Sequence, residues 1–197
     1  MLNDYAVLHS LLLKPGSGFC EPSQDLPQLV GFDDSAVSVM TDLKLVSVVL
    51  IRPADSVVEA NQRMIQRKVR LLLVVDESRK VVGIITATDI LGEKPMQVIA
   101  QRGGRRDDVR VSDIMTPQHQ LEVLRMDDVS GAKVGHIVAT LKRTGRQHAV
   151  VVEVDRGGGH TVRGIFSLTQ IARQLGVTIQ TSEIARTFSE IEIQLSR

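Results

Sequence analysis

The stretch Gly83-Ile84-Ile85-Thr86-Ala87-Thr88-Asp89 marks the point where an apolar strand ends and a helix begins. Gly83 leaves room for a backbone or a ligand to approach the strand closely. Asp89 stands beside the first free N–H groups of the helix, and its carboxylate, which only accepts hydrogen bonds, matches the two adjacent donor hydroxyls of a ribose. A plain helix start explains the same residues, because Thr88 can cap the helix and Asp89 favours the helix dipole. The spacing alone leaves both interpretations open.

The sequence around this stretch occurs twice. Val39-Met40-Thr41-Asp42 recurs as Ile114-Met115-Thr116-Pro117, and each copy leads through a turn-rich segment into an amphipathic helix, two apolar strands and a further helix. The order strand, helix, strand, strand, helix in both halves predicts an α/β fold built from two repeats. The expected segments are helices 56–68 and 132–143, strands 71–75, 81–85, 149–154 and 162–166, and helices beginning at 88 and 169.

The first of the long helices carries clear local signals. Ser56 and Glu59 have capping-box spacing, which predicts the start of the helix. The pattern places an apolar face along this helix, made of Val57, Ala60, Met64 and Ile65. Such a face needs a sheet to cover it.

The repeat order together with the string Gly-h-h-Thr-x-Thr-Asp, where h is apolar, resembles a tandem pair of CBS (cystathionine-beta-synthase-type) domains, a Bateman module, over residues 36–176. The resemblance implies an α/β fold in which two pseudo-symmetric β-α-β-β-α CBS repeats pack through their sheets and leave two clefts. We expect an N-terminal arm over 1–35, repeat 1 over 36–100, a linker over 101–110, repeat 2 over 111–176 and a C-terminal helix over 177–197.

The resemblance also implies a ligand, an adenosine-type nucleotide such as AMP, ADP, ATP or S-adenosylmethionine. It assigns Asp89 to the ribose hydroxyls, with Thr88 and Thr86 beside the sugar or the α-phosphate. In repeat 2, Gln170 stands where Asp89 stands in repeat 1. A neutral amide binds a hydroxyl less strongly than a charged carboxylate does, so we expect the second cleft to bind ribose poorly.

Further site residues follow from the same resemblance. Arg70 occupies the position of a phosphate-binding basic residue, although a solvated arginine explains it equally simply. Met115 and Thr116 are expected across the cleft, where they offer backbone groups and apolar contact to adenine. Gln147 and His148 are the pseudo-symmetric partners of Arg70, and a polar residue at the start of a strand is the simpler interpretation of His148.

Composition and the absence of known motifs argue against several other classes of function. The net charge of +1 provides no overall field for nucleic acid or membrane binding, and no apolar run approaches the length of a membrane span. No signal peptide is evident, so we expect a cytoplasmic protein. No Walker loop or Ser-His-Asp signature is found, and the five histidines and single cysteine do not have metal-site spacing, so neither an enzyme nor a metal site is expected.

The leading hypothesis is a regulatory sensor that acts in trans on an unknown protein partner. The alternative is a ligand-independent dimerisation scaffold in which the Thr-Asp motif only caps a helix. A third hypothesis, nucleic-acid binding through Arg102, Arg105 and Arg106, is weakened by the two aspartates that follow them. The apolar stripe Ile184, Phe188, Ile191 and Leu195 near the C-terminus needs a cover, which favours a homodimer.

Overall fold

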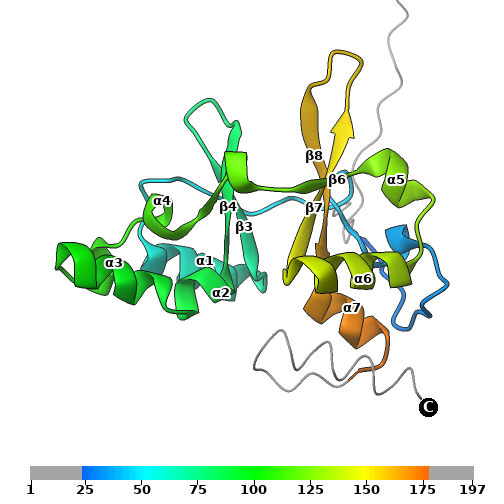
Figure 1. Cartoon of the computed structure of the whole chain (residues 1–197), viewed down its shortest axis with the longest axis horizontal. Helices are drawn as coiled ribbons and strands as arrows, with labels where there is room; N and C mark the ends of the chain where they lie inside the picture. The colour runs from blue at the N-terminus through cyan, green and yellow to red at the C-terminus, as the bar shows by residue number, and fades with distance from the viewer. Residues whose placement is uncertain (1–23, 178–197) are drawn as a thin grey trace, which may run out of the picture.

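A computed structural model describes residues 24–177, which form two units lying side by side (Figure 1). Each unit has a four-stranded sheet, and the predicted α/β fold is confirmed. The first unit contains β2 (Leu50–Ile51), α1 (Val57–Arg67), β3 (Leu71–Val75), β4 (Val81–Thr86), α2 (Ala87–Leu91) and α3 (Lys94–Arg102). The second contains β6 (Val123–Arg125), α5 (Met126–Ser130), α6 (Val134–Thr144), β7 (His148–Val154), β8 (His160–Ser167) and α7 (Leu168–Gln174). The N-terminal part of the expected arm and almost all of the expected C-terminal helix lie outside the described residues.

Helix α1 begins where the sequence predicts. The Ser56 side chain accepts a hydrogen bond from the Glu59 N–H at 3.1 Å. The predicted apolar face is partly wrong, because Ile65 is 68% exposed while Val57 and Met64 are buried. Successive residues are about 100° apart around a helix, and the sheet covers only the stripe through Val57 and Met64. Ile65 therefore faces solvent in this chain.

The two units exchange the short segments that precede them, here called the crossing segments 36–42 and 111–117. The first contains the 3-10 helix η1 (Ala36–Val39) and β1 (Thr41–Asp42), and the second contains α4 (Val111–Ile114) and β5 (Thr116–Pro117). Strand β1 pairs antiparallel with β8, and β5 pairs antiparallel with β4, so the sheet orders are β1-β8-β7-β6 and β2-β3-β4-β5. Each sheet thus takes one edge strand from the segment that precedes the other unit.

The hydrophobic cores follow the same exchange. Val39 and Met40 of the first crossing segment are buried in the core under α6 and α7, while Val111 and Ile114 of the second are buried in the core under α1 and α2. A third cluster lies between the two sheets and contains Leu71, Leu73, Ile84 and Val150. The units therefore pack through their sheets, and neither helical core is complete without the crossing segment that precedes the other unit.

Two glycines stand where the crossing segments meet the sheets. Gly83 pairs with Pro117, and Gly164 pairs with Asp42. A Cβ atom on Gly83 would lie 2.5 Å from the carbonyl oxygen of Thr116, and one on Gly164 would collide with the Met40 side chain. Gly83 therefore permits a close backbone approach, which is one of the two roles its position predicted.

We expect Gly83→Ala to lower the free energy of unfolding by about 1–3 kcal/mol, the usual cost of overpacking. The obstacle is the backbone of β5, which cannot shift without loss of its pairing with β4. Gly164→Ala should cost less, because its obstacle is the flexible Met40 side chain. Urea unfolding of the two variants makes the comparison, and an equal or larger loss for Gly164→Ala would contradict this account.

Candidate functional site

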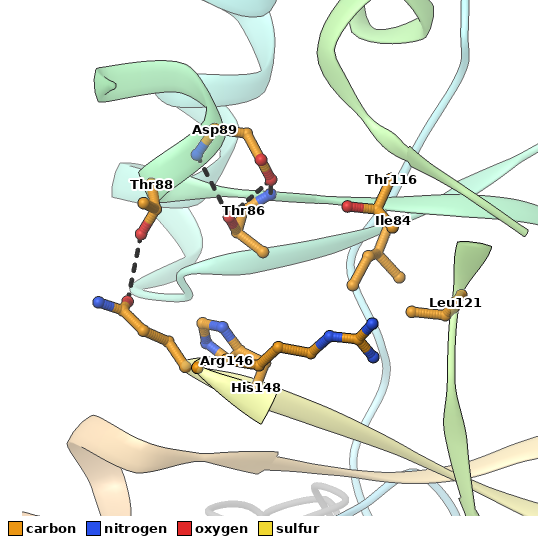
Figure 2. A pocket seen from close by; sticks show the side chains of 10 residues that line it. Ile84, Thr86, Thr88, Asp89, Thr116, Leu121, Arg146 and His148 are labelled. Carbon is orange, nitrogen blue, oxygen red and sulfur yellow. Dashed lines mark hydrogen bonds between the residues drawn. The ribbon is translucent and has the colours of Figure 1, made fainter. Parts of the chain in front are cut away.

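A cleft of about 200 Å³ opens between the two units at the end of β4 (Figure 2). The first unit and the crossing segment paired with it supply hydroxyl, carboxylate and apolar side chains, and the second unit supplies polar and cationic ones. The lining residues are Ile84, Thr86, Thr88, Asp89, Thr116, Leu121, Gly145, Arg146, Gln147 and His148. The structure therefore brings together five of the predicted site residues, namely Thr86, Thr88, Asp89, Thr116 and His148.

Asp89 lies in the first turn of α2 and is 9% exposed. Its Oδ2 accepts hydrogen bonds from the Thr86 backbone N–H at 2.8 Å and from the Thr86 hydroxyl at 2.7 Å. The Thr86 oxygen in turn accepts from the Asp89 N–H at 3.3 Å, which completes a capping box. The helix cap is thus Thr86 and not Thr88, because α2 begins one residue earlier than expected and leaves the Thr88 hydroxyl free to cross the cleft.

Lys94 is the other partner of Asp89. Its Nζ lies 2.5 Å from Asp89 Oδ1 and also donates to the carbonyl oxygen of Ile114 at 3.1 Å. Oδ2 thus accepts two hydrogen bonds from Thr86 and Oδ1 accepts one from Lys94, so a ribose that engages both oxygens must displace the Thr86 hydroxyl or share Oδ1 with Lys94. Sequence reasoning missed Lys94, because its role depends on the turn at Gly92 that begins α3 beside α2.

The opposite wall of the cleft comes from the segment before β7. The Thr88 hydroxyl donates to Gln147 Oε1 at 3.2 Å across the two units (Figure 2). Arg146, which the sequence analysis also missed, is the cationic side chain of this wall. Arg146 follows Gly145, the left-handed C-cap of α6. A glycine at the end of a helix can be recognised in the sequence, and it could have indicated that Arg146 lies in the turn between α6 and β7. A guanidinium in this position suits an anionic ligand group.

His148 begins β7 and lines both this cleft and a second one. Burial lowers the pKa of its imidazole to about 4, with a further contribution from the positive charge of Arg70 that outweighs the opposing effect of Asp89. The ring is therefore neutral at pH 7. A neutral imidazole offers one N–H donor and one nitrogen acceptor to a ligand.

Arg70 and Met115 lie elsewhere than predicted. Arg70 lines the second cleft, also about 200 Å³, on the side of Gln170. Arg70 and Gln147 occupy matching positions, because Leu71 pairs with Thr86 as His148 pairs with Ser167. Each lines the cleft that contains the motif of the other unit. Met115 packs against the core of the first unit and does not line either cleft.

Other classes of site find no support within residues 24–177. No group of three potential metal ligands occurs there, and no helix in that range is long and apolar enough to cross a membrane. Of the three linker arginines, Arg102 pairs with Asp113 at 2.6 Å and Arg106 donates to the carbonyl oxygen of Ile90 at 2.7 Å. Two of the three side chains that a nucleic acid would need are thus engaged within the protein.

The fold and the cleft define a module of two pseudo-symmetric α/β repeats with a ligand-sized cavity between them. Residues 36–95 match the CBS domain family. The second unit repeats the sheet and helix order of the first, an arrangement consistent with a tandem CBS pair.

Solved structures share this fold. An uncharacterized conserved protein from Pyrococcus horikoshii is similar with a TM-score of 0.54 and 22% identity, covering 78% of this chain and 100% of that one. A putative signal-transduction protein with CBS domains from Burkholderia ambifaria has a TM-score of 0.50 and 20% identity, covering 69% of this chain and 89% of that one. No curated protein matches the sequence.

Proposed function

We propose that the chain is a regulatory ligand-sensing module without catalytic activity, which binds an adenosine-type nucleotide in the Asp89 cleft and acts in trans on a protein partner. The observation that carries the proposal is the composition of the cleft. A carboxylate and two hydroxyls from one unit face a guanidinium and a neutral imidazole from the other across about 200 Å³. A ligand with a sugar at one end and an anionic group at the other matches both walls.

The cleft suggests one orientation for such a ligand. The ribose hydroxyls meet Asp89, and the phosphate meets Arg146, which makes charge-assisted hydrogen bonds at both ends. The apolar side chains of Ile84 and Leu121 are available for the flat face of the base. The second cleft has Gln170 in place of the carboxylate and is proposed to bind ribose weakly or not at all.

Sensing follows from the position of the cleft between the units. We propose that the two units can adopt two relative arrangements that differ in the width of the cleft. A ligand that contacts both walls favours the arrangement to which it binds more tightly, and the difference between its two affinities sets how far the population shifts. We propose that a protein partner or a second copy of the chain responds to this change in the arrangement of the units. The apolar stripe that favours a homodimer lies outside the described residues.

A ligand-independent scaffold is the second candidate function, and one observation favours it. Asp89 is engaged on both carboxylate oxygens by Thr86 and Lys94 without any ligand, as a residue that only starts a helix would be. In that case the cleft is a by-product of the packing of the two units. A ligand titration distinguishes the two functions.

We expect at least one of AMP, ADP, ATP, S-adenosylmethionine and NAD to raise the melting temperature by a few degrees. A ligand that binds only the folded state stabilises it by about 2.7 kcal/mol at a hundred times its dissociation constant. Differential scanning fluorimetry with each ligand at millimolar concentration measures the shift, with GTP as the control for the base. An unchanged melting temperature with every ligand would favour the scaffold.

A further inference from the structure

Arg146 stands between the candidate cleft and a neighbouring pocket. The neighbouring pocket has a volume of about 330 Å³, and Arg146 and His148 line both cavities. Figure 2 shows the Arg146 side chain extending toward Leu121 and away from Thr88 and Asp89. The guanidinium is thus turned to the end of the cleft where the neighbouring pocket begins.

Glu122 holds the guanidinium in that orientation. Its Oε2 lies 3.1 Å from Arg146 NH1, and the two side chains are 73% and 38% exposed. Strand β6 runs parallel to β7 with Val123 opposite Val150, which places Glu122 beside the start of β7, and the long Arg146 side chain reaches it from two residues before that strand. Among the described residues, Arg146 is the only ion-pair partner of Glu122.

We propose that Glu122 is a specificity-determining residue of the cleft, which competes with the anionic group of the ligand for Arg146. The inference rests on the proposed function and deepens it by naming what the cleft selects. A ligand with a highly charged phosphate chain forms an ion pair with Arg146 and breaks the Arg146–Glu122 pair, whereas an uncharged nucleoside leaves that pair intact. The module therefore responds to nucleotides according to the charge of their phosphate end.

The size of the effect follows from the exposure of the pair. An ion pair between exposed side chains contributes about 0.2–1 kcal/mol, so Glu122 weakens the binding of a phosphate by about 1.4- to fivefold. The carboxylate also adds a negative charge close to the site of the phosphate, and this repulsion grows with the charge of the ligand. Both contributions vanish for adenosine, which carries no phosphate.

Calorimetric titration of Glu122→Gln with adenosine, AMP and ATP tests the inference. We expect unchanged affinity for adenosine, about 1.4- to fivefold tighter binding of AMP, and a gain at least as large for ATP. Asp127→Asn is the matched control, because it removes one negative charge from the exposed Arg125–Asp127 pair of the same unit, and neither residue lines the cleft. In the Arg146→Met background, Glu122→Gln should lose most of its effect.

Each outcome bears on the inference separately from the proposed function. Binding of AMP to the parent with no gain in Glu122→Gln would overturn the inference and leave the proposed function in place. An equal gain for adenosine and ATP would also overturn it, because a general opening of the cleft would then be the cause. Failure of every adenosine ligand to bind either protein would remove the proposed function and the inference with it.

Discussion

Replacing Arg163 with valine should lower the free energy of unfolding by about 3–5 kcal/mol, the usual cost of leaving a buried charge without its partner. Arg163 on β8 pairs with Asp42 on β1, and their side chains are only 13% and 10% exposed. Arg163 Nε also lies 2.9 Å from Glu153 Oε1. This cluster joins the first crossing segment to the sheet of the second unit, so its loss should affect the whole fold.

The penalty should depend on pH. Burial by itself raises the pKa of Asp42, but the hydrogen bonds from Arg163 and from the Lys44 N–H outweigh it and hold the pKa below its ordinary value of 3.8. A depressed pKa contributes stability above the unfolded-state value and loses it as the pH falls through the folded-state value. Arg163→Val removes this contribution, so parent and variant should differ most at pH 7 and less below about pH 3.8. Urea unfolding across this range measures the difference.

The chain itself provides the control for this prediction. In the first unit, Pro117 and Val82 occupy the positions that correspond to Asp42 and Arg163, so the same junction is built there without charges. Asp42→Asn/Arg163→Val removes both buried charges and should recover a large part of the loss. If the double variant is as unstable as Arg163→Val, or if Arg163→Val costs less than about 1 kcal/mol, the pair is not what holds the crossing segment.

Local pattern was sufficient to predict the framework of the fold. The run Leu71–Val75 is continuously apolar and became β3, a strand buried along its whole length. Gly145 is the left-handed C-cap of α6, which ends at Thr144, one residue beyond the end predicted from the sequence. Such features depend on residues close together in the chain, and the repetition of their order indicated two similar units.

The exchange of the crossing segments could not be predicted from local pattern, and only the family resemblance placed Met115 and Thr116 across the cleft. Each segment contributes a strand of two residues, too short for any periodicity, and nothing in Thr41–Asp42 specifies which sheet it joins. The candidate site was affected directly. Arg70 was assigned to the cleft of its own repeat, whereas the packing of the two units places Arg146 there and Arg70 in the other cleft.

Short helices were missed for a related reason. Helix α5 occupies a polar stretch that resembles a loop, with Asp127 and Asp128 in its first turn and one buried apolar side chain, Val129. A single turn of helix has no repeated apolar spacing, so its stability comes from the core it touches. The same holds for the contact of Lys94 with Asp89, which exists only once α3 has turned back beside α2.

Replacing Asp89 with asparagine should weaken nucleotide binding by about ten- to a hundredfold, because a charge-assisted hydrogen bond of roughly 1.5–3 kcal/mol is lost while the shape of the side chain is kept. The substitution also removes the partner of Lys94 and a favourable charge at the start of α2. We expect a stability loss of at most about 1 kcal/mol from these two changes, so binding must be measured well below the melting temperature of each variant.

Gln170→Ala is the matched control, because it alters the corresponding position of the second cleft and leaves the first intact. Calorimetric titration should show parent-like affinity for Gln170→Ala and a clear loss for Asp89→Asn. The two roles of Asp89 then separate cleanly. If the Asp89 carboxylate binds the ribose hydroxyls, Asp89→Asn loses more binding free energy than folding free energy. If the carboxylate only completes the capping box with Thr86, the variant is less stable but binds the nucleotide with unchanged affinity. Equal affinities for Asp89→Asn and the parent would assign Asp89 to the helix start and move the search for the ligand contacts to Arg146 and His148.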